Sequence, residues 1–307
     1  MELTAYNYQF TKIVTQDKEQ QSIEFPDGIE GVDAEVSFEN RQDIIGDLFM
    51  QHTAGEQFFW VGDRNKRYKV MLLIDGREKQ DVFFLLFCNN RKRQCEDCNV
   101  FYKVEDFPGC VVIIDNRPKK QALFIQQNNA FPDTKSVARA LRFVFHGLLK
   151  PFGLDIRIDA MFKVSEFWDM VRLTPSGFKT IEFRYPFLNL ARLSDIAGEF
   201  ITGARKELNS SMVVTHCAEP GGKLTINRKD HLTERQVAAA ASSGEPIKMV
   251  PFGKNRAIVC GGKTYVVMEL SDQIEHINSN DILCADSIDE VKKEMNNIYR
   301  TYLDEAQ

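Results

Sequence analysis

The chain has 307 residues and a mass of 35.2 kDa, which corresponds to about two domains of ordinary size. Hydrophobic residues make up 43% of the chain and charged residues 27%, and no tract is compositionally biased. This composition excludes collagen-like, coiled-coil and largely disordered proteins. The longest apolar runs are too short to cross a membrane and the amino terminus has no signal-peptide pattern, so we expect a cytoplasmic protein.

Short apolar runs bounded by turn residues recur through the first 130 residues and predict a sheet. The turns are short, which is typical of hairpins and therefore of an antiparallel meander. One helix is expected within this region, at 41–52, where apolar residues recur at helical spacing. The expected strands cover 3–13, 57–62, 67–75, 81–88, 99–104, 110–115 and 121–126.

A second α+β pattern follows the clearest helix of the sequence, which is expected at 133–150 and ends before Pro151. The sequence therefore predicts an α+β fold with a largely antiparallel sheet, packed helices and a second, smaller α+β domain. We place the N-terminal domain at 1–175 and the C-terminal domain at 176–307. Later elements are expected as strands at 154–162, 177–185, 211–217 and 222–227, further strands between 246 and 269, and helices beginning near Ser165, 189, Thr233 and Ser287.

Charge is distributed unevenly along this acidic chain, whose net charge is −5. Residues 1–60 carry 3 basic and 12 acidic groups, whereas residues 61–150 carry 17 basic and 10 acidic groups. The basic side chains gather at expected hairpin turns, and turns at one end of a meander lie close together, so the three clusters are expected to form one surface for a phosphate backbone. Solvated turns are the alternative interpretation. The clusters are Arg64, Lys66, Arg67 and Lys69, then Arg91, Lys92 and Arg93, then Arg117, Lys119 and Lys120.

Aromatic residues precede the first basic cluster. Phe58, Phe59 and Trp60 are consecutive and suit either base stacking or, more often, a buried core. Helical residues Lys135, Arg139 and Arg142 are expected on one polar face that extends or merely solvates the same surface.

Four of the seven cysteines lie within 23 residues, and two of them have the two-residue spacing of a metal-binding pair. A structural zinc ion held by Cys88, Cys95, Cys98 and Cys110 is therefore one hypothesis. The alternative is that Cys88 and Cys110, which border apolar runs, are small buried core residues.

No catalytic motif is evident. Five carboxylates, Asp155, Asp159, Glu166, Asp169 and Glu182, are candidates for a metal-dependent nuclease, and solvated strand ends explain them equally well. The Gly-Gly-Lys segments at 221–223 and 261–263 lack the spacing and helix of a phosphate-binding loop, and are interpreted as hairpin turns with solvated lysines.

The order of elements resembles a known family. The segment VVIIDNRPKKQALFIQQ (111–127), the helix at 133–150, and the segments LDIRIDAMFKVSEFWDMV (154–171) and GFKTIEFRYPFLNL (177–190) resemble the arrangement in RexA-like phage-exclusion proteins. The same pattern is similar to that of the DNA-binding subunit of the Kiwa antiphage system. The resemblance covers about residues 105–230 and transfers no site residues. It implies a homodimeric, two-domain, non-enzymatic DNA-binding protein of bacterial antiphage defence, acting by phage exclusion or abortive infection.

From these observations we expect a cytoplasmic, non-catalytic protein that binds double-stranded DNA through its basic turns. Two alternatives stay open: a metal-dependent nuclease, and an interaction subunit whose cationic face binds an acidic protein partner. No cofactor is expected apart from the zinc ion of the cysteine hypothesis.

Overall fold

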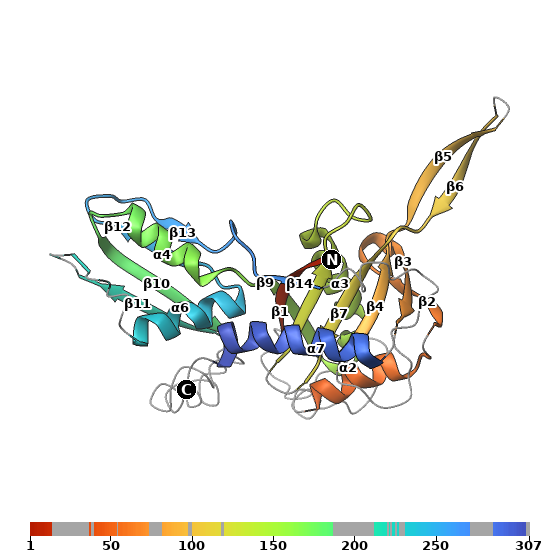
Figure 1. Cartoon of the computed structure of the whole chain (residues 1–307), viewed down its shortest axis with the longest axis horizontal. Coiled ribbons are helices and arrows are strands. Elements are labelled where there is room, and N and C mark those ends of the chain that lie inside the picture. The colour runs from red at the N-terminus through yellow and green to blue at the C-terminus, as the bar shows by residue number, and fades with distance from the viewer. Residues whose placement is uncertain are drawn as a thin grey trace, which may run out of the picture. The chain divides into compact units, whose positions relative to one another are not determined.

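The structure is a computed structural model with the predicted α+β class and antiparallel sheets (Figure 1). Within the residues it describes, no helix is long and apolar enough to cross a membrane. The described residues are 1–13, 37, 40–53, 55–73, 82–97, 100–117, 120–186, 212–219, 221, 223–224, 226, 231–270 and 285–304.

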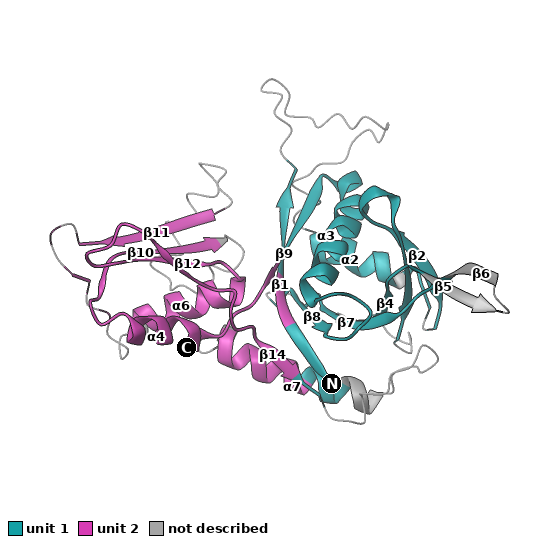
Figure 2. Cartoon of the chain, turned by 90° about the horizontal axis from the view of Figure 1, so that it is seen from above, with its two compact units in different colours: residues 1–4, 8–158, 269–292 teal, residues 5–7, 159–268, 293–307 magenta. Residues whose placement is uncertain are grey.

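The chain divides into two compact units, and each is discontinuous in sequence (Figure 2). Unit 1 comprises residues 1–4, 8–158 and 269–292, and unit 2 comprises residues 5–7, 159–268 and 293–307. The sequence predicted a single boundary between 175 and 176. Helix α4 (Val164–Leu173), which that boundary assigns to the first domain, contacts helix α6 (His231–Ser243) of unit 2.

Most of the larger sheet is built from strands of unit 1, in the order β14-β1-β8-β7-β4-β3-β2, and β9 also pairs with β1. The predicted strands and the first two helices are observed within a few residues of their expected ends. The elements are β1 (Glu2–Lys12), α2 (Arg41–Met50), β2 (Gln57–Val61), β3 (Arg67–Leu72), β4 (Val82–Cys88), β7 (Gly109–Asp115), β8 (Ala122–Gln126), α3 (Thr134–Leu149), β9 (Leu154–Ala160) and β14 (Val267–Glu269), with short 3-10 turns η1 (Asp63–Asn65) and η2 (Lys150–Phe152).

Aromatic side chains join the two helices of unit 1 to one face of this sheet. Phe49 of α2 stacks on Phe83 of β4 with 4.5 Å between ring centroids. Trp60 of β2 packs against Phe145 of α3 at 5.6 Å and is itself buried. Such rings supply much of the buried area of a core, so this layer fixes which face of β2, β3 and β4 points inward.

The expected meander is wrong between β4 and β7. These two strands pair with each other, because the chain between them forms a separate two-stranded ladder, β5 (Arg91–Asp97) with β6 (Val100–Asp106). The ladder extends from the end of the sheet (Figure 1). Its first strand was expected as a turn, since the sequence RKRQCED has no apolar alternation.

Unit 2 contains a four-stranded antiparallel sheet in the order β11-β10-β12-β13. Helices α4 and α6 contribute to its core, which includes Phe167, Phe183 and Val237. The expected helix at 189–208 lies outside the described residues, and the described part of the expected strand 222–227 contributes one bridge, Phe178 to Leu224. The remaining elements are β10 (Phe178–Pro186), β11 (Met212–Ala218), β12 (Ile247–Pro251), β13 (Ile258–Cys260), α7 (Ala285–Tyr299) and the π-helix η4 (Arg300–Asp304).

A buried carboxylate organises the loop that follows β13. One oxygen of Glu166 accepts the N–H of Gly261 at 2.9 Å, and the other accepts the N–H and the hydroxyl of Thr264, each at 3.0 Å, and the N–H of Lys263 at 3.3 Å. The loop reaches this conformation through φ values of 104° at Gly261 and 136° at Gly262, which favour glycine. The Gly-Gly-Lys segment at 261–263, which was expected to be a simple hairpin turn, is therefore part of a loop whose N–H groups donate hydrogen bonds to the buried carboxylate of Glu166.

Replacing this carboxylate by its neutral isostere is expected to weaken unit 2. Glu166→Gln puts an amide NH₂ against backbone donors, and leaving charged hydrogen bonds unmade should lower the free energy of unfolding by about 2 kcal/mol. Trp168 fluorescence during urea unfolding, recorded in a Trp60→Phe background, measures the change. The matched control is Asp169→Asn on the same helix, whose exposed pair with Arg172 should cost no more than about 0.5 kcal/mol. Equal stability of the two variants would contradict the role given to Glu166.

Candidate nucleic-acid interface

Strand register decides which basic turns share an end of the sheet. Lys69 of β3 pairs with Cys88 of β4, and Cys88 pairs with Gly109 of β7. Val82, at the other end of β4, pairs with Asp115. The clusters at 64–69 and 91–93 therefore lie at one end, and the turn at 117–120 lies at the opposite end, roughly 20 Å away along β4. The expectation that all three clusters meet is wrong.

The third turn also differs in chemistry. Arg117 donates from Nε to Oδ1 of Asp115 at 2.9 Å and from Nη2 to Oδ2 at 2.7 Å. Asp115 is completely buried, so this bidentate pair offsets the charge of Arg117 within the fold. Lys120 is half-buried, and Lys119 lies outside the described residues. This turn is therefore a structural corner with little accessible charge among its described residues.

The first two clusters are tied together by hydrogen bonds. Lys66 donates from Nζ to Oδ1 of Asn89 at 2.7 Å, and the Asn89 amide donates to the carbonyl of Ala130 at 2.9 Å. Arg91 donates to the carbonyl of Asn129 at 2.8 Å and also to that of Ala130. Partial burial and the neighbouring Arg91 lower the pKa of Lys66. These bonds fix the start of β5 and the loop before α3 against the β2–β3 hairpin.

We call this region the cationic end and define it by Arg64, Lys66, Arg67, Lys69, Arg91 and Lys92. Three acidic residues accompany these six cations: Asp63, and Glu105 and Asp106, which pair in register with Lys92 and Arg91. Positive charge therefore exceeds negative charge by three within these residues. Arg93 pairs with Val104 in the backbone register of the ladder. Helix α3, which contacts η1, presents exposed Lys135 and Arg139.

Arg64 occupies an unusual backbone position. It has a φ of 52° and is followed by Asn65 with a φ of 59°, so both residues lie in the left-handed region. Asparagine tolerates that region, whereas for a long side chain it costs about 1 kcal/mol. The side chain of Arg64 is 93% exposed, and its nearest ion-pair contact, with Asp63, is 3.8 Å long. The fold thus retains an arginine where another residue would be more stable.

The aromatic run before this turn is divided by strand alternation. Phe58 stacks on His52 with 3.7 Å between centroids, and Trp60 is buried. Phe59 points to the other face and is 44% exposed. The guanidinium of Arg67 lies 4.3 Å from the Phe59 ring centroid, and the ring of Phe107 packs edge-on at 6.1 Å. The core interpretation is therefore right for Trp60 and not for Phe59.

Two of the four cysteines of the zinc hypothesis, Cys88 and Cys110, have side chains that the structure describes. Cys88 pairs with Gly109 and Cys110 pairs with Phe87, so the two thiols point to opposite faces of the sheet. Cys95 pairs with Tyr102, four residues along the ladder from Arg91, and Cys98 lies outside the described residues. Since Zn–S bonds are about 2.3 Å long, thiols on opposite faces of the sheet do not fit one zinc ion, and this applies to Cys88 and Cys110. The core interpretation fits Cys88 and Cys110, which are buried.

The carboxylates of the nuclease hypothesis also lie apart. Asp155 contacts His146 at 2.9 Å, Asp169 contacts Arg172 at 3.0 Å, and Glu182 contacts Arg184 at 2.9 Å. Glu166 is occupied by its loop. The described part of the chain contains no group of three His, Cys, Asp or Glu side chains that could hold a metal ion.

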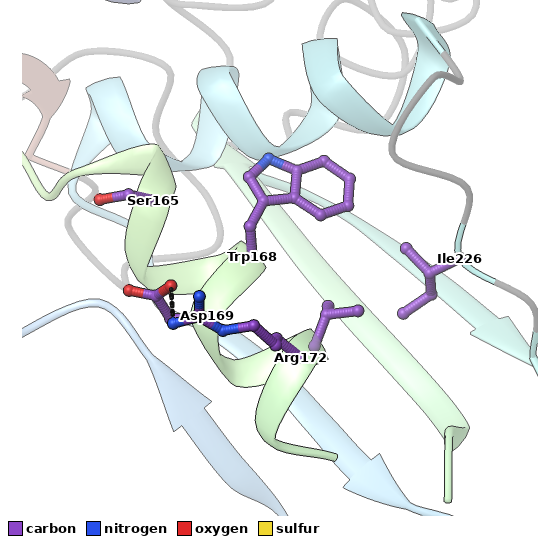
Figure 3. A pocket seen from close by; sticks show the side chains of 6 residues that line it. Ser165, Trp168, Asp169, Arg172 and Ile226 are labelled. Carbon is purple, nitrogen blue, oxygen red and sulfur yellow. Dashed lines mark hydrogen bonds and ion pairs between the residues drawn. The ribbon is translucent and has the colours of Figure 1, made fainter. Parts of the chain in front are cut away.

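A small pocket of about 280 Å³ lies beside α4 in unit 2 (Figure 3). Figure 3 shows the indole of Trp168 on one side, Ile226 opposite, and the Asp169–Arg172 ion pair at the edge. Ser165 and Val171 complete its lining. Because the single carboxylate among these residues is paired with arginine, the pocket offers an aromatic surface without an acid–base set.

Comparison with known proteins gives no match among family models, curated proteins or solved structures.

Buried thiols should react slowly in the folded protein. Burial raises the pKa of Cys88 to about 11, and burial together with nearby Cys88 raises that of Cys110. Iodoacetamide at pH 8, followed by site-resolved mass spectrometry, should label both at least tenfold more slowly than partly exposed Cys217, because thiolate is the reacting form. Urea should remove the difference.

The raised pKa of Cys88 also predicts how the stability of the protein changes with pH. A thiol in the unfolded chain ionises near pH 8.5, whereas native Cys88 keeps its proton until about pH 11. The folded state therefore binds more protons in this window and should lose stability as pH rises from about 8.5 to 11. Rapid native labelling of Cys88 at pH 8 would show that the buried-thiol assignment is wrong.

Proposed function

We propose that the protein binds double-stranded DNA, without catalysis, through the cationic end. The observation that carries this proposal is the gathering of two basic clusters, 64–69 and 91–93, at one end of the larger sheet. Register brings their strands together, and the hydrogen bonds of Lys66, Asn89 and Arg91 hold them there. The turn at 117–120 is left out of the proposed interface.

Exposed guanidinium and ammonium groups on a fixed hairpin suit phosphate contacts. Lys66 and Arg91 already donate hydrogen bonds within the protein, so Arg64, Arg67 and Lys92 are the groups most accessible to DNA. Phosphate contacts position a protein on the duplex and carry no base sequence. The proposed binding is therefore tolerant of sequence and strongly dependent on salt concentration, because each neutralised phosphate releases counterions.

The resemblance stated for residues 105–230 supports the same class of activity. It extends the proposal to a homodimer in bacterial antiphage defence, acting in the cytoplasm. The nuclease alternative has less support, since the described residues contain no group of three side chains that could hold a metal ion, and Asp155, Asp169 and Glu182 each pair with a histidine or an arginine. A protein partner for the cationic end is an outcome of the tests below.

Reversing three exposed charges should weaken duplex binding. For Arg64→Glu, Arg67→Glu and Lys92→Glu combined, we expect at least a tenfold loss of affinity at low salt, measured by fluorescence anisotropy with a blunt duplex. The slope of log affinity against log salt should fall by about 2 to 3, since each lost phosphate contact removes about 0.9. Loss of affinity without a change in slope would contradict phosphate contact.

A triple variant in unit 2 controls for net charge. Lys179→Glu, Lys254→Glu and Arg256→Glu changes three exposed residues and adds the same negative charge. Measured at 0.1 M salt beside the first variant, it should retain affinity within about twofold, because it leaves the residues of the cationic end unchanged and long-range charge effects are screened. A Lys119→Glu/Lys120→Glu variant tests the excluded turn in the same way and should also retain binding. If all three variants bind equally weakly, the cationic end is not the interface.

Replacing Arg64 by asparagine should raise the stability of the protein and lower its affinity for DNA. Arg64→Asn keeps a residue that tolerates the left-handed backbone, so the free energy of unfolding should rise by up to about 1 kcal/mol. Affinity for duplex should fall two- to fivefold, since one charge is lost. Urea unfolding and anisotropy on the same preparations test both directions. The opposite result, lower stability with unchanged affinity, would show that Arg64 serves the fold alone.

A further inference from the structure

We propose that the outward face of the β2–β3 hairpin is a stacking site for an unpaired nucleobase, with Phe59 as its platform. This inference rests on the proposed DNA binding and adds a substrate class. DNA that carries a single-stranded segment beside a duplex should bind more tightly than the blunt duplex alone.

The outward face is defined by register. Phe59 pairs with Lys69, which pairs with Cys88, which pairs with Gly109, so these four positions form one row across β2, β3, β4 and β7. Val61 and Arg67 form the neighbouring pair toward the hairpin turn. Phe59 and Val61 are 44% and 54% exposed. Strand β2, at one end of the strand order, therefore has apolar surface on its outward face.

The core does not need the Phe59 ring. Trp60 and Phe58 supply the inward contacts of β2, toward Phe145 and His52 respectively. Phe59 instead contacts Arg67 and the edge of Phe107, both near the surface. An aromatic ring left half in water at the edge of a cationic surface is unfavourable for an isolated protein and suits a ligand that has both a flat apolar face and negative charge.

A single-stranded nucleic acid has both features. Its bases stack on aromatic rings and on guanidinium planes, while its phosphates are drawn to nearby cations. Here the guanidinium of Arg67 lies over the Phe59 ring, 4.3 Å from its centroid, so the ring supports a guanidinium plane on which a base can stack. The ammonium of Lys69 lies 5.8 Å from the Phe107 ring centroid. If a base stacks at Phe59, the phosphate on one side of it would contact Lys69. The phosphate on the other side, toward the hairpin turn, would contact Arg67 and Arg64. A base inside a duplex has no free face, so the site selects unpaired bases.

The occupant to which this chemistry points is DNA rather than a protein segment. The exposed apolar residues Phe59 and Val61 pair with the basic residues Lys69 and Arg67. A single strand likewise has flat apolar bases next to charged phosphates, so its bases can contact the apolar residues while its phosphates contact the basic ones. An acidic peptide is the competing occupant, and failure of the wild type to bind any of the DNA probes below would favour it.

The test compares three fluorescent probes by anisotropy: a blunt duplex, the same duplex with a thymine overhang, and the free single strand. Wild-type protein should bind the overhang duplex about tenfold more tightly than the blunt duplex. Phe59→Leu, which keeps an apolar side chain without a ring, should lose that preference and keep blunt-duplex affinity within about twofold. Unchanged blunt-duplex binding also shows that the variant is folded.

Phe252→Leu is the matched control, because Phe252 is 46% exposed and lies in unit 2. It should keep the overhang preference. A 2-aminopurine placed in the overhang gives a second readout: its emission should be quenched on wild-type protein and restored on Phe59→Leu.

The failures of the two proposals can be told apart. If the wild type binds the blunt duplex and the overhang adds nothing, or Phe59→Leu leaves the preference intact, the stacking site is wrong and the cationic end stands. If the wild type binds none of the probes, DNA binding itself is wrong and the stacking site falls with it. Unchanged 2-aminopurine emission on binding would overturn the stacking site even where affinities agree.

Discussion

The antiparallel register of β3, β4 and β7 is the constraint on which the proposed interface depends. It places Lys69 beside Cys88 and Cys88 beside Gly109, and in doing so it sets which turns share an end of the sheet. A shift of one residue would exchange the two faces of a strand. Lys69 would then point into the aromatic layer, and Tyr68, which stacks on Phe87 inside it, would point out. Burial of those rings makes such a shift unfavourable.

Gly109 contributes to this register through the absence of a side chain. A Cβ there would lie 2.8 Å from the Leu86 side chain and 3.0 Å from the Cys88 sulfur, which is closer than ordinary packing allows. Because Gly109 has no side chain, β4 and β7 can approach each other closely at the point where β4 ends and the β5–β6 ladder begins. The same place holds the bonds from Asn89 and Arg91 to the loop before α3. The basic side chains of the cationic end therefore project from backbone segments that are fixed by packing and by hydrogen bonds.

Sequence patterns predicted the α+β class and most strand positions, because apolar runs between turn residues are a local signal. They did not predict register, which depends on contacts between strands distant in sequence. For that reason the expected meeting of three turns was wrong, although two of the three do meet. Strand β5 was missed because charged residues occupy positions where a half-buried strand would alternate. Glu166 was seen as an isolated carboxylate, since its partners follow it by 95 to 98 residues.

For the candidate site, the sequence identified the right residue types and could not separate their roles. Arg117 and Arg64 look alike in a turn, yet one is paired with a completely buried aspartate and the other stands almost fully in water. Phe59 and Trp60 are neighbours with the same composition signal, and only strand alternation assigns one to the core and the other to the surface. Burial and pairing, which decide function here, are properties of the folded chain.

Charge outside the cationic end bears on how DNA would approach. The chain as a whole has a net charge of −5, and residues 1–60 alone carry 12 acidic groups against 3 basic ones. Attraction of a duplex would therefore have to come from the cationic end, where basic side chains outnumber acidic ones, and this would restrict the orientations of productive encounter. A uniformly basic protein would gain affinity from many orientations and lose the ability to present one feature to the nucleic acid. In the proposed interface the cationic end adjoins the exposed ring of Phe59, so the field that would attract phosphates would also bring bases toward an aromatic surface.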